Sequence, residues 1–138
     1  MASISTRLRN RVAARANHRC EYCLTSQRVT GAQMHVEHIV PIAHGGTSHE
    51  DNLCLACAWC NSFKATAIRA VDPISRRKVG LFNPRTDIWG EHFYWSDDSA
   101  LIIGLSAKGR ATISALRMNN EFIVPARRQW VIAGWHPP

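Results

Sequence analysis

The stretch 35–64 reads HVEHIVPIAHGGTSHEDNLCLACAWCNSFK, and its pattern decides the fold that we expect. The residues before Pro41 alternate loosely and include several β-branched side chains, so they predict a short strand over 33–40 that the proline ends. Two glycines then predict a loop, and a short apolar run follows over 52–57. The residues 58–70 predict a helix that an Asp-Pro pair stops. This order of elements is typical of a small α+β unit.

Two Cys-x-x-Cys pairs accompany this stretch, one upstream of it and one near its end. Tetrahedral zinc binds four thiolates at about 2.3 Å, and each pair can direct two sulfurs at one ion. We therefore predict a structural zinc site, with the ligands Cys20, Cys23, Cys57 and Cys60. Cys54 also forms a Cys-x-x-Cys pair with Cys57, so whether Cys54 replaces one of the four ligands stays open. We expect Cys54 instead to be buried and to act as a small apolar side chain. The alternative is that all five cysteines are reduced and unliganded.

Length and charge restrict the class of protein. The chain has 138 residues and is 46% hydrophobic, which fits one small packed domain, with or without an appendage, better than a disordered chain. Its 17 lysines and arginines outnumber 10 acidic residues, and all of them fall in the segments 1–28, 64–85 and 108–128. This distribution favours a polyanionic partner, above all nucleic acid, although solvated surface arginines would produce it too.

The sequence also bears on the compartment. No apolar run approaches the roughly 18 residues of a membrane-spanning helix, and the first ten residues contain no apolar leader segment. We therefore expect a cytoplasmic protein without a membrane partner. In that setting cysteines serve as metal ligands or free thiols rather than as disulfides.

Outside the central stretch, helical periodicity, alternation and a serine cap predict further elements. They are a basic amphipathic helix over 4–17, a hairpin of 93–95 and 101–105, a helix from the Ser106 cap to about Met118, and a last helix over 124–133. We expect two parts: a domain over 1–78, with its core at about 11–70, and an extension over 79–138. The hairpin and the two helices of the extension are expected to pack on that core.

Several short motifs follow one another along 20–64. They are Cys-x-x-Cys (20–23), Glu-His-Ile-x-Pro (37–41), Gly-Gly (45–46), Asn-Leu (52–53), Cys-x-x-Cys (57–60) and Cys-Asn-x-x-Lys (60–64). On these motifs the chain resembles, over about 11–64, the HNH endonucleases in their zinc-stapled form, also called ββα-metal or His-Me finger nucleases. The resemblance implies a ββα-metal core with a structural four-cysteine zinc site, preceded by a basic helix and followed by a small α/β extension.

The resemblance also implies a role for each polar residue, matched by position. Glu37 and Asn61 correspond to the ligands of a catalytic Mg²⁺ or Mn²⁺, and such ions prefer oxygen ligands. His38 corresponds to the general base, a task that suits histidine because its side chain titrates near neutral pH. Asn52 corresponds to a residue that holds the loop bearing His38 by hydrogen bonds. Asn61 stands where the family often has histidine, which should disfavour softer metals.

Strand geometry places a condition on Glu37 and His38. Successive side chains of a strand point to opposite faces, so these two can meet one ion and one phosphate only if the chain bends or the strand ends there. Pro41, three residues further on, favours a strand end.

The predicted function is hydrolysis of DNA phosphodiester bonds by a water that His38 activates, with one Mg-type ion. The resemblance implies 5′-phosphate and 3′-hydroxyl ends. Double-stranded DNA is the expected partner, and the expected contacts are Arg7, Arg11, Arg15 and Lys64. Two alternatives stay open, a non-catalytic zinc-dependent nucleic-acid-binding module and an RNA-directed nuclease. A homodimer or larger assembly also stays open.

Overall fold

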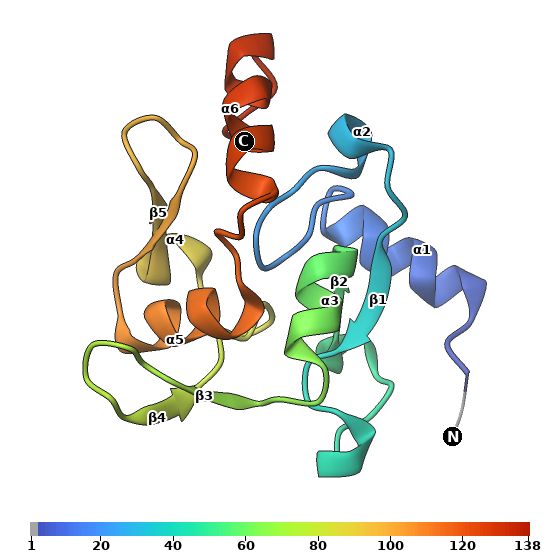
Figure 1. Cartoon of the computed structure of the whole chain (residues 1–138). Helices are drawn as coiled ribbons and strands as arrows, with labels where there is room; N and C mark the ends of the chain where they lie inside the picture. The colour runs from blue at the N-terminus through green and yellow to red at the C-terminus, as the bar shows by residue number, and fades with distance from the viewer. Residues whose placement is uncertain (1–2) are drawn as a thin grey trace. The chain divides into compact units, whose positions relative to one another are not determined.

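The computed structural model describes residues 3–138, which divide into two compact units (Figure 1). The first unit comprises 3–68 and 83–86, and the second comprises 69–82 and 87–138. The domain boundary that the sequence suggested at residue 78 stays a prediction. Among the described residues, no helix has both the length and the apolar character needed to cross a membrane.

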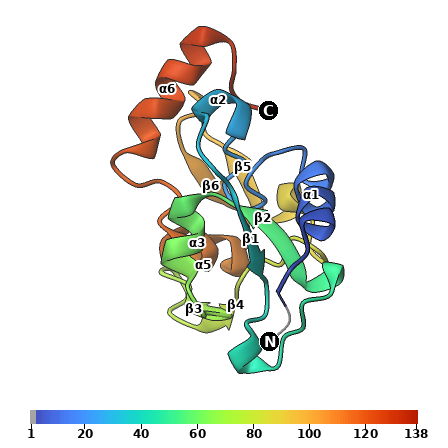
Figure 2. The ribbon, with the colours of Figure 1, turned by 90° about the vertical axis from the view of Figure 1, so that its right-hand side faces the viewer.

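The first unit is built on an antiparallel hairpin. Strand β1 (His35–His38) pairs with β2 (Leu53–Ala56), and the helices α1 (Thr6–Arg15) and α3 (Ala58–Lys64) lie on opposite faces of this pair (Figure 2). A short helix α2 (Gln27–Thr30) precedes β1. Together, β1, β2 and α3 form a ββα core, which confirms the predicted fold class.

The apolar core of the first unit lies between α1 and the hairpin. Val12 of α1 is fully buried against Leu53 and Leu55 of β2. Ser5 caps α1 by accepting a hydrogen bond from the Leu8 amide, so the helix predicted over 4–17 is confirmed with slightly shorter ends. The strand predicted over 33–40 is also confirmed, as the shorter β1.

The helix predicted over 58–70 is wrong in its second half. Helix α3 ends at Lys64, and Ala65 has a φ of 47° and a ψ of −123°, a conformation outside the helical region that stops the helix. Strand β3 (Arg69–Val71) begins where the helix was expected to continue, and it pairs with β4 (Lys78–Gly80). The Asp72-Pro73 pair therefore opens a hairpin turn instead of ending a helix.

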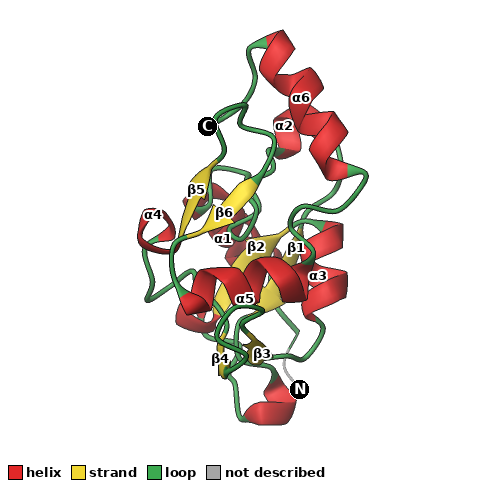
Figure 3. Cartoon of the chain, turned by 60° about the vertical axis from the view of Figure 1, so that its left-hand side comes forward, coloured by secondary structure: helices red, strands yellow, loops and turns green. Residues whose placement is uncertain are grey.

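The second unit contains this hairpin and a second one, formed by β5 (Phe93–Trp95) and β6 (Ile102–Gly104). Helix α5 (Ala107–Leu116), capped by Ser106, contacts β3, β4 and β6 (Figure 3). The short α4 (Trp89–His92) precedes β5, and α6 (Ile123–Ala133) ends at Gly134, whose φ is 81°. The hairpin and the two helices predicted for this part of the chain are thus confirmed as elements.

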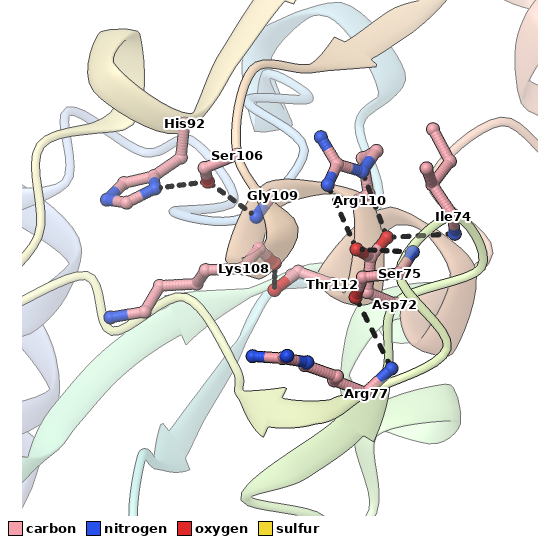
Figure 4. Close-up of polar contacts among 10 residues, drawn as sticks. All are labelled: Asp72, Ile74, Ser75, Arg77, His92, Ser106, Lys108, Gly109, Arg110 and Thr112. Carbon is pink, nitrogen blue, oxygen red and sulfur yellow. Dashed lines mark hydrogen bonds and ion pairs between the residues drawn. The ribbon is translucent and has the colours of Figure 1, made fainter.

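A buried carboxylate holds the turn between β3 and β4. Asp72 is fully buried, and the Arg110 guanidinium donates to both of its oxygens at 2.9 Å. The backbone amides of Ile74 and Ser75 donate to the same carboxylate. Figure 4 shows the arrangement. The hydrogen bonds from Arg110, aided by those from the turn, hold the pKa of Asp72 well below its usual range.

We expect Asp72→Asn to lower the melting temperature at neutral pH, because the amide loses the ion pair with Arg110. A carboxylate whose pKa is depressed by folding stabilises the protein above its unfolded-state pKa, and this contribution disappears as the pH falls through the folded-state value. The difference between the parent and Asp72→Asn should therefore shrink below about pH 4. Thermal unfolding followed by circular dichroism from pH 7 downward measures it. The exposed Asp97→Asn is the control, and a difference that is independent of pH would contradict the assignment.

Candidate functional site

The four predicted zinc ligands come together in the first unit. The sulfurs of Cys20, Cys23, Cys57 and Cys60 all lie within 4.8 Å of one another. Those of Cys23 and Cys57 are 3.7 Å apart, close to the roughly 3.8 Å that a tetrahedral site with bonds of about 2.3 Å requires. In each pair the second backbone amide donates to the first sulfur, at 3.5 Å and 3.4 Å, as in a metal-binding knuckle. The cluster indicates a structural zinc site.

Cys54 stands apart from this cluster. It is fully buried in β2, opposite Glu37 of β1, and its thiol donates to the Tyr22 hydroxyl at 3.7 Å. Burial raises the pKa of Cys54 to about 12, so the neutral thiol is the stable form. The cluster thus contains Cys57 and Cys60 and excludes Cys54.

Glu37 is a buried carboxylate on β1. The residue is only 7% exposed, and its Oε2 atom has no hydrogen-bond partner among the described residues. Burial raises the pKa of Glu37 to about 7, although the charge of Lys64 opposes this shift. Buried oxygens in native proteins are normally satisfied, and a carboxylate oxygen is a ligand that Mg²⁺ and Mn²⁺ accept. The unsatisfied oxygen thus fits a divalent-cation site.

His38 is the last residue of β1, so the strand ends there, as the alternation argument required. The ring is half-buried, and its Nε2 lies 2.9 Å from the Ser48 hydroxyl oxygen. When that hydroxyl accepts from Nε2–H, the other ring nitrogen, Nδ1, keeps its lone pair for a proton. Ser48 was missed at the level of sequence, because a serine in a Gly-Gly-Thr-Ser loop carries no signal for the histidine that it contacts.

The side chain of Asn52 forms hydrogen bonds with both ends of the loop that follows His38. Its amide group donates to the carbonyls of Val40 and Thr47 at 2.9 Å and 2.8 Å, and its oxygen accepts from the Val40 amide at 2.9 Å. Gly46 completes the closure, since a Cβ there would stand 1.7 Å from the Val40 carbonyl oxygen. The loop therefore has the hydrogen bonds that the sequence predicted for Asn52.

Asn61, the second predicted ligand, lies on α3, which packs against β1 and β2. Asn61 is partly exposed, and its helix contacts β1, the strand that carries Glu37. An amide oxygen and a carboxylate oxygen form a donor set of the type that hard cations prefer. The role of Asn61 as a ligand stays a prediction.

The four predicted DNA contacts differ in their surroundings. Arg7 is exposed on α1, whereas Arg11 is ion-paired with Glu50 at 2.7 Å, and Arg15 donates to the carbonyls of Glu50 and Leu53. Arg11 and Arg15 therefore connect α1 to Glu50 and to the start of β2.

Lys64 differs most from the expectation of an exposed or phosphate-facing side chain. It is only 1% exposed, and its ammonium donates to the His38 carbonyl at 3.4 Å. Burial lowers the pKa of Lys64, and the charge of Glu37 opposes that shift. Its position is that of an internal counter-charge beside Glu37, because α3 turns this side of the helix toward β1.

A ββα core with a buried carboxylate, a histidine at the strand end and a four-cysteine cluster defines the class of ββα-metal proteins. Residues 20–66 match the family model described as HNH endonuclease, which identifies this segment as an HNH domain. The match covers about a third of the chain and spans all four clustered cysteines. Comparison with curated proteins and with solved structures gave no match.

Proposed function

We propose that the protein is a metal-dependent endonuclease that hydrolyses phosphodiester bonds of double-stranded DNA. One observation carries the proposal: the unsatisfied, buried carboxylate of Glu37 directly precedes His38 at the end of β1, within an HNH domain. A non-catalytic zinc module would need the cysteine cluster but would have no use for a buried carboxylate oxygen that no hydrogen bond satisfies.

The proposed reaction gives each residue a task. Nδ1 of His38 accepts a proton from a water molecule, whose oxygen attacks phosphorus in line while the bond to the 3′ oxygen breaks. The departing 3′ oxygen takes a proton from solvent water, so the products are a 5′-phosphate and a 3′-hydroxyl. Ser48 orients the imidazole through Nε2, and Asn52 holds the loop that bears Ser48.

Glu37 and Asn61 would hold the catalytic cation, Mg²⁺ or Mn²⁺. When bound, this cation supplies positive charge next to the scissile phosphate and its leaving oxygen. Because Glu37 must be ionised to bind it, and burial raises the pKa of Glu37 to about 7, affinity for the cation should increase as the pH rises through neutrality.

We expect the parent protein to nick or linearise a supercoiled plasmid only in the presence of Mg²⁺ or Mn²⁺. Glu37→Gln should lower the rate by at least about 10², because an amide cannot supply the negative charge that holds the cation. Gel analysis of plasmid cleavage gives the rate, and calorimetric titration with Mn²⁺ gives the cation affinity. Each protein is first checked for one bound zinc and for folding.

Glu121→Gln, which removes an exposed carboxylate of the second unit, serves as the matched control and should cleave at the parental rate. A folded parent that binds DNA without cutting it in any divalent cation would favour the binding-module alternative. Cleavage of RNA but not of DNA would establish the RNA-directed alternative.

A further inference from the structure

The hairpin of β3 and β4, residues 69–80, concentrates positive charge at the surface of the second unit. We call it the basic hairpin. Its four cationic side chains are exposed: Arg69, Arg76, Arg77 and Lys78. The one acidic residue in this range, Asp72, is fully buried and paired with Arg110, so it does not neutralise them. The exposed face of the hairpin is therefore cationic.

The conformation of the basic hairpin is fixed from within the second unit. The Arg110 guanidinium of α5 donates hydrogen bonds to the Asp72 carboxylate, and the amides of Ile74 and Ser75 donate to the same carboxylate (Figure 4). The Asp72 amide also donates to the Arg77 carbonyl, and α5 contacts both strands. A cationic surface held in one conformation loses little entropy when it binds a partner.

The basic hairpin also exposes apolar side chains between its charges. Ile74, in the turn, is 72% exposed, and Val71 at the end of β3 is 51% exposed. Proteins that bind duplex DNA combine cations on phosphates with apolar side chains that contact base edges or base steps. The major groove is about 12 Å wide and admits a two-stranded ribbon. A ribbon of this charge and composition thus fits duplex DNA.

We propose that the basic hairpin is a DNA-contacting surface in its own right, in which Arg76, Arg77 and Lys78 bind phosphates and Ile74 contacts a groove. The proposal takes duplex DNA as the partner from the proposed function, but it concerns binding and does not depend on His38 or on a catalytic cation. It assigns a role to three cations of the basic segment 64–85 that lie outside the matched residues 20–66.

The test is the affinity of the full-length, zinc-loaded chain for a fluorescent DNA duplex, measured by anisotropy without Mg²⁺ at several salt concentrations. The variant carries Arg76→Gln, Arg77→Gln and Lys78→Gln. The matched control removes three exposed cations elsewhere, by Arg28→Gln, Arg117→Gln and Arg128→Gln. Both reduce the formal charge from +7 to +4, so they match in net charge, although the control also removes the exposed ion pair of Arg128 with Asp98.

We expect the hairpin variant to bind at least about tenfold more weakly than the control and to lose about 3 from the slope of log affinity against log salt, near one for each phosphate contact. Ile74→Ser should weaken binding severalfold and leave the salt slope unchanged, since it removes an apolar contact. Circular dichroism should show parental melting for all three proteins, because the replaced side chains are exposed.

Equal affinity and slope for the hairpin variant and the control would overturn the proposal, as would a parent that binds no duplex DNA at low salt. An effect confined to RNA duplexes would also overturn it. Its failure is distinct from that of the nuclease assignment. If the parent cuts plasmid and the hairpin variant binds DNA like the control, the nuclease assignment stands and the hairpin proposal fails. If the parent binds DNA through the hairpin but does not cut it, the hairpin proposal stands and the nuclease assignment fails.

Discussion

Replacing Cys60 by alanine will unfold the first unit, whereas the same replacement at Cys54 will leave it folded and zinc-loaded. Both residues are buried cysteines six positions apart, but only Cys60 belongs to the cluster whose sulfurs lie within 4.8 Å of one another. Structural zinc sites contribute about 10–16 kcal/mol of binding free energy in small zinc-finger peptides, and that energy is coupled to folding. A chain whose apolar core is this small depends on such a contribution.

The thiols of the cluster explain why the loss should be large. Burial raises the pKa of Cys20 well above its ordinary value, whereas hydrogen bonds with the other three cysteines hold the pKa of Cys23 well below its own, so without a cation the four thiols do not all favour the thiolate that zinc binds. Removing one ligand leaves three sulfurs that cannot complete a closed tetrahedral site. The helix α3 would also be affected, since it begins at the Cys57 cap and contains Cys60.

Zinc content by atomic absorption, together with thermal unfolding by circular dichroism, measures the effect. Cys60→Ala should contain less than one zinc per chain and should lose its cooperative transition for the first unit, and a zinc chelator should produce the same change in the parent. Cys54→Ala should retain the metal and lose only the small contribution of a buried thiol. Similar melting of the two variants would show that the cluster does not support the fold.

The parts of the structure that the sequence predicted well are those determined by local chemistry. The spacing of the two cysteines in each knuckle and the serine that caps α5 depend on nearby residues, and the structure confirms both. The strand end at His38 also followed from alternation and from Pro41.

The parts that were missed depend on contacts between distant residues. Lys64 is turned inward because α3 packs on β1, a fact that a lysine in a Cys-Asn-x-x-Lys motif does not disclose. Arg11 reaches Glu50, and Asp72 reaches Arg110, each across more than thirty residues of chain. A sequence shows that such charges exist, but their pairing is decided by the tertiary fold.

His38→Ala should reduce plasmid cleavage by at least about 10² and leave DNA affinity and zinc content at the parental values. A positioned general base contributes about 10²–10⁴ in rate, and alanine cannot accept the proton of the attacking water. The side chain is half-buried, and the substitution removes its hydrogen bond to Ser48 while leaving the backbone of β1 unchanged, so folding should be preserved. His44→Ala, which removes an exposed histidine from the adjoining loop, is the matched control and should cleave at the parental rate.

Cleavage rates under single-turnover conditions separate the chemical step from DNA binding. If His38→Ala cuts as fast as the parent, another group takes the proton, and the tasks assigned to His38 and Ser48 are wrong even if the protein is a nuclease. If His38→Ala binds DNA normally and fails to cut, while Glu37→Gln fails to bind the cation, the two neighbouring residues have the separate tasks that their surroundings favour. The buried carboxylate of Glu37 then serves the cation, and the half-buried imidazole of His38, the last residue of β1, serves the water.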